Sequence, residues 1–374
     1  MTRPRILYLT PGVFDKGGIS RYGRYQITAL RQFAEVRVLS LCGPDADSFE
    51  DPFAVHWHGI RPRHSDRVAL SLQALAQSLR WRPDVIHAAH VNMTPLIANL
   101  ARFVGATTVL NVYGRELWGK LSVRRRRALY RSGRVIADCY ATADHVAHHR
   151  MHADTPTVIW DCVDLDRFSP GPADPAVLAR YGLSGGAGPI ILSLGRLARG
   201  AEHKGFDRLI TAFQSLNTPK ARLVIAGDGD DRGRLEGLAQ AAGLGPRCVF
   251  TGLVADNDLP DFYRAARVFA LVSDKGPGRG EGLPLTPIEA LACGTPVVVG
   301  NEDGSSEAVD GDRNGRVISP RDPQAYVAAL GDLLAQPEAP ARHRARQVAQ
   351  ERFGFNACAR KHRDFYDTIV RGPR

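Results

Sequence analysis

The most informative run of this 374-residue chain reads Gly278-Arg-Gly-Glu-Gly-Leu-Pro-Leu-Thr-Pro-Ile-Glu-Ala-Leu-Ala-Cys-Gly-Thr-Pro-Val-Val-Val-Gly300. Its first glycines let backbone N–H groups approach a ligand closely, because glycine has no Cβ. A helix is expected next, with Thr286 as N-cap, Pro287 as its first residue and an end at Cys293 and Gly294. The apolar residues 297–299 then predict a strand buried on both faces. The run therefore encodes a loop, a helix and a strand.

Two carboxylates, Glu281 and Glu289, frame this unit. Pro284 and Pro287 stand between them and prevent one continuous helix from carrying both, so Glu281 lies on the loop and Glu289 in the first helical turn. Two interpretations of Glu289 stay open, because it either completes a capping box with Thr286 or binds a ligand. A helix N-terminus entered through a glycine loop suits a phosphate, and a carboxylate beside it can accept hydrogen bonds from sugar hydroxyls.

The residues around these carboxylates also match a known pattern. Glu281, seven further residues and Glu289 are followed by Ala-Leu-Ala-Cys-Gly-Thr-Pro-Val-Val. This closely resembles the Glu-x7-Glu signature of the retaining nucleotide-sugar glycosyltransferases of family 4, which have the GT-B fold. The resemblance implies that Glu281 contacts the donor sugar and that Glu289 holds the ribose of the nucleotide. It also places at the donor the neighbouring residues Gly282, Leu283, Pro284 and Leu285.

Length and composition agree with a two-domain protein that remains inside the cell. A chain of 374 residues favours two domains or one large one. No run approaches the roughly 18 apolar residues of a membrane span, and residues 1–9 read as a first strand rather than as a cleaved signal. The six cysteines form no C-x-x-C pair, which is typical of reduced thiols in a cytosolic protein and predicts no structural zinc.

The net charge of +10 is concentrated in the first half of the chain. Residues 1–170 carry 23 Lys and Arg against 15 Asp and Glu, whereas the remainder carries 26 against 24. A basic surplus indicates an anionic ligand, a membrane surface or a nucleic acid as partner. With the resemblance in view, we expect a nucleotide sugar as donor, a glycan or lipid-linked acceptor and no nucleic acid.

Short apolar runs alternate with helical patterns along the whole chain. Continuous apolar runs predict strands buried on both faces, hence parallel sheets covered by helices. The expected strands are 6–9, 36–41, 85–87, 108–112, 135–137 and 158–160, then 190–194, 223–226, 248–251, 268–272, 297–299 and 317–318. We predict an α/β chain of GT-B type, with two doubly wound Rossmann-like domains at 1–170 and 171–354 and a terminal helix at 355–374 that crosses back to the first. Open sheets bind ligands at the carboxyl ends of their strands, which predicts a site in the cleft between the two domains.

A glycine pair, Gly17 and Gly18, follows the first expected strand. A plain turn with Ser20 as helix cap is one interpretation. A dinucleotide site is disfavoured, because the spacing is not G-x-G-x-x-G and the second strand ends at Cys42 without the acid that would hold a ribose. The pair instead resembles the family's N-terminal loop, which approaches the donor phosphates.

Two further candidates follow expected strands of the first domain. His87 and His90 lack a third ligand at a suitable spacing, so a hydrogen-bonded histidine near the cleft is favoured over a metal site. Tyr113 stands before Gly114, where the family commonly has a histidine that touches the donor sugar. Its phenol can still bond a sugar hydroxyl. We therefore expect His90 and Tyr113 to contact the sugar or the acceptor.

In the second domain, Gly195-Arg196-Leu197 and Lys204-Gly205 resemble the family's Gly-Arg-Leu and Lys-Gly pair. Two cations and a helix N-terminus can stabilise a leaving nucleoside diphosphate without a metal, so no metal cofactor is expected. Leu253 resembles a family residue near the nucleobase. Runs that imitate a metal-binding Asp-x-Asp follow two strands at 228–230 and 256–258, where roles in turns and caps are favoured.

An arginine run is the densest basic part of the chain. It comprises Arg124, Arg125, Arg126 and Arg127, near Leu121, Leu129 and Tyr130. One interpretation is a solvated helix face. The other is a docking patch for anionic lipid or a phosphorylated acceptor, which would place the protein peripherally at the inner membrane face.

The resemblance to family 4 implies a glycosyltransferase of the hexosyltransferase type. It would move a sugar from a UDP- or GDP-sugar to an acceptor hydroxyl on a glycan or a lipid-linked acceptor, with retention of the α configuration. Glu281, Arg196 and Lys204 are the expected catalytic residues. The alternatives are a GT-B sugar-nucleotide epimerase or hydrolase, and a non-catalytic protein that binds nucleotide sugars or anionic surfaces.

Overall fold

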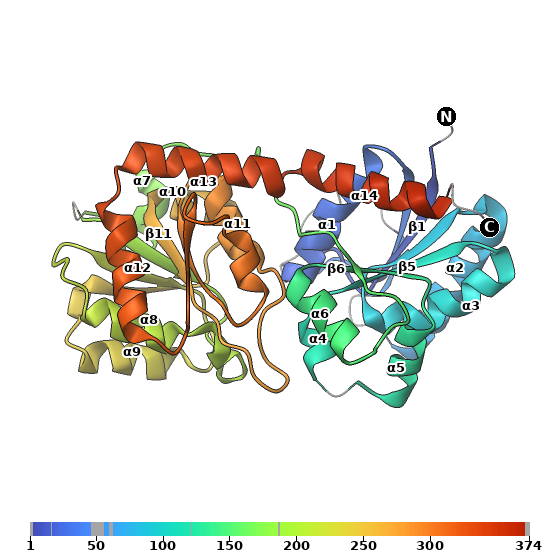
Figure 1. Ribbon diagram of the computed structural model, residues 1–374, viewed down its shortest axis with the longest axis horizontal. Coiled ribbons are helices and arrows are strands. Elements are labelled where there is room, and N and C mark those ends of the chain that lie inside the picture. Colours follow the sequence, from blue (N-terminus) through green and yellow to red (C-terminus); the bar gives the residue numbers. More distant parts are fainter. Residues whose placement is uncertain are drawn as a thin grey trace. The chain divides into compact units, whose positions relative to one another are not determined.

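A computed structural model of the chain describes residues 3–15, 17–45, 56–59, 63–119, 121–185 and 188–370. The chain forms two compact units (Figure 1). The first unit ends at Cys162 and also contains the last helix, and the second unit is Val163–Gly354. The expected boundary lay at residue 170. Val163, which precedes that boundary, donates a backbone hydrogen bond to Phe353 of the second unit at 2.8 Å.

The first unit is built on a parallel sheet of seven strands in the described residues, in the order β3-β2-β1-β4-β5-β6-β7. Its strands are β1 (Arg5–Thr10), β2 (Glu35–Cys42), β3 (His56–Gly59), β4 (Val85–Ala88), β5 (Thr107–Val112), β6 (Arg134–Ala137) and β7 (Thr157–Val158). Its helices are α1 (Gly18–Arg31), α2 (His64–Trp81), η1 (Val91–Met93), α3 (Thr94–Val104), α4 (Arg115–Trp118), α5 (Val123–Tyr130), α6 (Tyr140–His148) and α14 (Phe355–Val370).

Both faces of this sheet are covered, as continuous apolar strands require. On one face, Leu7 and Leu9 of β1 pack with residues of α2, α3 and α5. On the other, Ile6 and Tyr8 pack with residues of α1 and α14. Alternate residues of one strand thus serve two cores. The carboxyl ends of the strands, and the loops that follow them, lie along one edge of the sheet.

The second unit repeats this architecture with a parallel sheet of six strands in the described residues, in the order β10-β9-β8-β11-β12-β13. Its strands are β8 (Ile190–Leu194), β9 (Arg222–Ala226), β10 (Cys248–Gly252), β11 (Ala266–Leu271), β12 (Val297–Gly300) and β13 (Gly315–Ile318). Its helices are α7 (Pro175–Arg180), η2 (Arg199–Lys204), α8 (Phe206–Gln214), α9 (Arg232–Ala241), η3 (Gly245–Arg247), η4 (Asp256–Asp258), α10 (Leu259–Ala265), α11 (Leu285–Ala292), η5 (Gly304–Ala308), α12 (Pro323–Ala335) and α13 (Glu338–Arg352).

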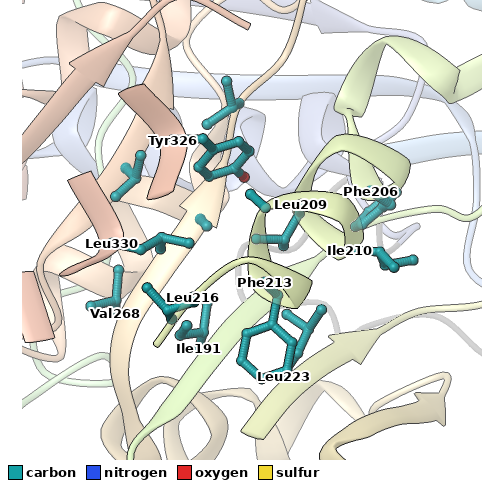
Figure 2. Close-up of a cluster of buried hydrophobic side chains, with 14 of the residues drawn as sticks. Ile191, Phe206, Leu209, Ile210, Phe213, Leu216, Leu223, Val268, Tyr326 and Leu330 are labelled. Atoms are coloured by element: carbon teal, nitrogen blue, oxygen red, sulfur yellow. The ribbon is translucent and has the colours of Figure 1, made fainter. Parts of the chain in front are cut away.

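The core of the second unit fixes the loops that follow its strands. Figure 2 shows Leu209 and Phe213 of α8 packed toward Leu223 of β9, with Leu330 of α12 beside Val268 of β11. All five of these side chains are at most 1% exposed. Burying one such side chain stabilises a fold by about 1.5 to 3 kcal/mol. The strand ends of this sheet therefore offer a rigid edge on which side chains can be held in fixed positions.

Candidate functional site

A group of charged side chains lies at the carboxyl edge of the second sheet. Arg196 follows β8, Glu281 follows β11 and Asp303 follows β12, while Lys204 ends the short helix η2. Carboxyl ends of parallel strands meet at one edge, and this is where open α/β sheets bind ligands. The sequence-predicted Arg196, Lys204 and Glu281 are thus brought to the same edge.

Glu281 and Lys204 form a direct ion pair. The Lys204 Nζ donates to Glu281 Oε1 at 2.5 Å, and His203 Nε2 lies 3.1 Å from the same oxygen. The Lys204 and Glu281 side chains are 17% and 19% exposed. Burial alone would raise the pKa of the Glu281 carboxyl, but the Lys204 charge and the hydrogen bond from His203 outweigh it and lower the pKa to about 2. Glu281 is therefore a carboxylate over the whole physiological range.

The backbone of Glu281 is held as firmly as its side chain. Its N–H donates to Asp303 Oδ2 at 2.9 Å, and its carbonyl accepts from the N–H of Gly304 at 3.2 Å. Asp303 is 3% exposed and also accepts from the N–H of Ser305. The preceding residue, Gly280, has a φ of +136°, which a side chain would rarely allow. The loop therefore presents the Glu281 carboxylate in one orientation.

Arg196, also at the carboxyl edge of the second sheet, has no ion-pair partner among the described residues. Its side chain is exposed and makes no ion pair or hydrogen bond with the residues that the structure describes. The preceding Gly195 allows the Lys204 side chain to lie across the backbone, because a Cβ there would sit 3.2 Å from the Lys204 Cδ. Arg196 and Lys204 thus share one loop surface, and one of the two charges is uncompensated.

The helix after Glu281 differs in one respect from expectation. α11 begins at Leu285 with Pro284 as N-cap, so Thr286 lies inside the helix and the predicted Thr286 cap is wrong. No side chain of the described residues caps this N-terminus. The proline ring at the N-cap cannot donate a hydrogen bond, and it leaves the first N–H groups of the helix available for an anion.

Glu289 lies one turn into α11 and is 1% exposed. The hydroxyl of Tyr263 in α10 donates to its Oε2 at 2.8 Å. The capping-box interpretation fails, because Thr286 is not the N-cap. Gly282 and Pro284 are half-buried, whereas the side chains of Leu283 and Leu285 are buried. Of these predicted donor contacts, the two leucines can therefore offer only backbone groups to a ligand.

The two acidic runs of the second unit differ, because Asp228 makes a local turn bond whereas the Asp258 side chain does not cap α10 and bonds residues far away in the sequence. Asp228 accepts the N–H of Gly229, and Asp258 bonds Arg180 and Tyr181. Among the described residues, no group of three or more His, Cys, Asp or Glu is placed to hold a metal ion. Leu253, in contrast, is 76% exposed just after β10, where an apolar face is free for a planar ligand.

In the first unit, Gly17 is the N-cap of α1 and Gly18 its first residue. The Ser20 cap is therefore wrong, and Ser20 instead donates to Asp15 and to the carbonyl of Gly12. Gly17 has a φ of −67°. A Cβ on Gly18 would meet no atom of the described residues within 4 Å, so neither strain nor crowding from these residues requires glycine there. The open space at this helix N-terminus leaves room for a ligand.

His87 in β4 and His90 just after it are both held by hydrogen bonds. His87 lies between the Tyr366 hydroxyl at 2.5 Å and Asn111 Oδ1 at 2.9 Å. His90 accepts the N–H of Asn92 through Nδ1 at 3.1 Å. Burial lowers the pKa of His87 to about 3, and burial together with the charge of Arg125 lowers that of His90 to about 4. Both imidazoles are neutral at physiological pH.

Tyr113 is held by a chain of buried polar side chains. Neutral His87 accepts from Tyr366 at Nδ1, so its Nε2 carries the proton and donates to Asn111 Oδ1. The Asn111 amide then donates to the Tyr113 hydroxyl at 3.2 Å and to Gln26 at 3.1 Å. The Tyr113 oxygen accepts, and its own proton has no acceptor among the described residues. The phenol is therefore poised to donate to a ligand.

The arginine run lies at the surface of α5. Arg124 to Arg127 are all exposed, as is Tyr130. Leu129, which the sequence offered as part of the same surface, is fully buried in the core of the first unit. The apolar residue exposed beside the run is instead Val123, at 68%. No helix among the described residues is long and apolar enough to span a membrane.

Several positions of these sites were not singled out from the sequence. His203 and Tyr263 hold the two carboxylates, Asp303 holds the backbone of Glu281, and Asn111 holds Tyr113. His203 directly precedes Lys204, and Asn111 stands two residues before Tyr113 on the same strand. Proximity to a recognised motif was the available signal for these two. Tyr263 lies on another helix and gave none.

The chain matches two family models. "Glycosyltransferase Family 4" matches residues 16–167, and "Glycosyl transferases group 1" matches residues 183–352. The D-inositol 3-phosphate glycosyltransferase of Xylanimonas cellulosilytica is 33% identical over 297 residues, which cover 77% of this chain and 67% of that relative. The GDP-mannose-dependent alpha-(1-6)-phosphatidylinositol monomannoside mannosyltransferase of Mycolicibacterium smegmatis is 35% identical, and the match spans 65% of each chain.

Solved structures agree with these matches at the level of the fold. The Anabaena protein HepE, solved with UDP and glucose, has a TM-score of 0.77 and 19% identity, and the match covers 98% of this chain and all of that one. The sequence prediction of fold and family is confirmed: this chain belongs to glycosyltransferase family 4, and its two parallel-sheet units have the GT-B fold.

Proposed function

We propose that the protein is a retaining glycosyltransferase that moves a sugar from a nucleoside diphosphate sugar to an acceptor hydroxyl. The observation that carries this is the edge of the second sheet, where the Lys204–Glu281 pair, unpartnered Arg196 and the uncapped start of α11 converge. Glu289 would hold the ribose, the surface of Leu253 the base, and Glu281 the sugar. Relatives named for GDP-mannose and phosphatidylinositol mannoside support a hexose donor and a lipid-linked acceptor.

The charges of this edge suit the departure of a phosphate. As the bond between sugar and phosphate breaks, negative charge grows on the nucleoside diphosphate. Arg196, Lys204 and the N-terminus of α11 can stabilise it. Glu281, with a pKa of about 2, is a weak base and already paired. In our proposal the leaving phosphate oxygen therefore takes the acceptor proton, and the new bond forms on the face from which the phosphate departs. No protein nucleophile is needed.

In the same proposal the first unit contributes contacts to the acceptor, the sugar and the phosphates. Tyr113 can donate its free proton to a sugar hydroxyl, and neutral His90 can bond the acceptor. Gly18 leaves open space for phosphate oxygens at the start of α1, and Gly17 would offer its backbone beside it, since a Cβ on Gly17 would sit 2.7 Å from Asp15 Oδ1. These roles extend the family pattern, with a phenol in the position where an imidazole is usual.

The direct test is transfer of labelled sugar from a panel of UDP- and GDP-sugars to glycan and lipid-linked acceptors. We expect transfer with an α-linked product, and we expect it to persist in EDTA because cations replace a metal. Hydrolysis or epimerisation of the donor without transfer would identify another reaction. Activity that disappears in EDTA and returns with manganese would refute the metal-free mechanism.

We further propose that the exposed arginine run of α5 holds the protein reversibly at an anionic membrane face. Each basic residue near such a surface contributes about 1 kcal/mol. Sedimentation with vesicles should show binding that requires anionic lipid, weakens with salt and decreases when Arg124 to Arg127 are replaced by Ser. Equal sedimentation of that variant, or none of the parent at low salt, would show an ordinary solvated helix.

A further inference from the structure

The first unit contains an apolar groove that the proposed donor site does not use. It encloses about 750 Å³ between α2 and α3, which both begin at the carboxyl edge of the sheet. Leu70, Met93 and Leu100 form its buried floor. Leu72 and Phe103 line its rim and are 63% and 72% exposed. Apolar side chains left open to water in a contiguous patch typically mark a binding surface.

The polar lining of this groove has one sign of charge. Arg67 and Arg125 line it, and no Asp or Glu does so among the described residues. Neither guanidinium makes an ion pair or side-chain hydrogen bond within the part of the chain that the structure describes. Unpaired guanidinium groups prefer the oxygens of a phosphate or carboxylate, which they can bind with two hydrogen bonds. The groove thus lacks an anion to match its two charges.

Both arginines lie toward the carboxyl edge of the sheet. Arg67 is in the first turn of α2. Arg125 lines the groove together with Asn92, whose backbone N–H donates to His90 Nδ1 at 3.1 Å. From Arg67 to Leu75 the helix rises about 12 Å, and Leu75 and Leu96 also line the groove. The groove therefore has a charged end, formed by Arg67 and Arg125 near His90. Its apolar part continues from there along α2 and α3.

We propose that this groove binds the lipid end of a phosphorylated acceptor, with the phosphate at Arg67 and Arg125 and the apolar chain between α2 and α3. The inference rests on the proposed function, since it identifies the acceptor class of the same reaction. The occupant is a single lipid phosphate rather than a bilayer surface, because the apolar lining is a groove between helices. The sugar-accepting end would then lie beside His90.

The probe for this site is n-octyl phosphate, kept below its micelle concentration and titrated calorimetrically into the full-length protein. Inorganic phosphate and n-octanol serve as comparators, because each carries half of the proposed chemistry. We expect octyl phosphate to bind at least tenfold more tightly than either. Shortening the chain to butyl phosphate should weaken binding by about threefold to fourfold for each methylene removed. Equal binding of octyl and butyl phosphate would overturn the proposal.

The chain supplies matched controls. Arg67→Ser with Arg125→Ser removes the groove cations, whereas Arg124→Ser with Arg127→Ser removes two arginines of the same run that do not line it. We expect the first pair to weaken octyl phosphate by about tenfold or more, and the second to change it less than twofold. Equal losses in both pairs would indicate general electrostatic attraction and would refute a defined site.

A second comparison tests the apolar part. Leu72→Ser with Phe103→Ser should also weaken octyl phosphate by tenfold or more, whereas Val68→Ser with Leu79→Ser, exposed on α2 outside the groove, should not. All four residues are at least half exposed, so the variants should fold. Nucleoside diphosphate affinity, measured on the same samples, should be unchanged. If nucleotide binds and octyl phosphate does not, the groove proposal alone fails; if nucleotide does not bind, the proposed function fails.

Discussion

The polar side chains of the two units are held in opposite ways. In the second unit, ions are paired before any ligand arrives, since Lys204 and His203 both contact Glu281. In the first unit, neutral groups form a buried chain in which His87 and Asn111 lead to Tyr113. The ion pair of the second unit can stabilise charge that develops during a reaction. The neutral chain of the first unit fixes the direction of one hydrogen bond.

This difference has a physical cause. A buried ion survives only with a partner, so Glu281 requires Lys204 close by. A neutral phenol or amide requires only complete hydrogen bonding, which His87, Asn111 and Gln26 supply to one another. Changes in the second unit should therefore alter rate and stability strongly. Changes in the first should have smaller effects, which depend on one another.

The largest expected effect is on catalysis by the second unit. Arg196→Ala and Lys204→Ala should each lower kcat/KM by about 10²- to 10³-fold, because each removes a cation from the leaving phosphate. Steady-state kinetics of the transfer reaction measure this. Arg199→Ala, an exposed arginine of the neighbouring η2, is the matched control and should change kcat/KM little. Losses of equal size in the control would show a general effect of surface charge.

The ion pair should also be visible as pH-dependent stability. The folded-state pKa of Glu281 is about 2, below its usual 4.5. The stability that this carboxylate contributes is therefore fully present above pH 4.5 and is lost as pH falls toward 2. The parent should have a higher free energy of unfolding than Glu281→Gln above pH 4.5. This difference should decrease by about 1.4 kcal/mol for each pH unit below 4.5. Urea unfolding between pH 3.5 and 6.5 tests this, and a pH-independent difference would contradict the pairing.

The smallest effect is expected in the first unit. Tyr113→Phe and Asn111→Ala should each reduce kcat/KM by an amount equivalent to about 0.5 to 1.5 kcal/mol, the net contribution of one hydrogen bond. If Asn111 acts by orienting the Tyr113 hydroxyl, the double variant should lose little more than either single variant. Additive losses in this double-mutant cycle would mean that Asn111 acts independently of Tyr113.

Much of this fold could be predicted from the sequence, because buried parallel strands are continuous apolar runs. β8 has the predicted bounds, Ile190–Leu194. β3 was missed because His56–Gly59 contains no such run. The strand expected at 158–160 is instead β7, Thr157–Val158. The helix cap expected at Thr286 failed because Pro284 occupies the N-cap position.

The candidate site was predictable only in part. Glu281, Arg196 and Lys204 stand in motifs that the sequence displays directly, and the structure brings them to one edge of the second sheet. Their supporting contacts arise between segments far apart in the chain, as when Tyr263 reaches Glu289. Local patterns carry no information about such contacts. The pairing of Glu281 with Lys204 likewise depends on which strands are neighbours in the sheet.

The central claim is that the second unit binds a nucleoside diphosphate sugar through Glu289 and Glu281 in different roles. Calorimetric dissociation constants of UDP, GDP and their sugar conjugates, measured in EDTA for the parent, Glu289→Ala and Glu281→Gln, test it most directly. We predict that Glu289→Ala weakens both nucleotide and donor by about 1.5 to 3 kcal/mol, whereas Glu281→Gln weakens only the additional affinity due to the sugar. Unchanged nucleotide affinity in Glu289→Ala, with only a lowered Tm, would contradict this account and leave Glu289 as a structural partner of Tyr263.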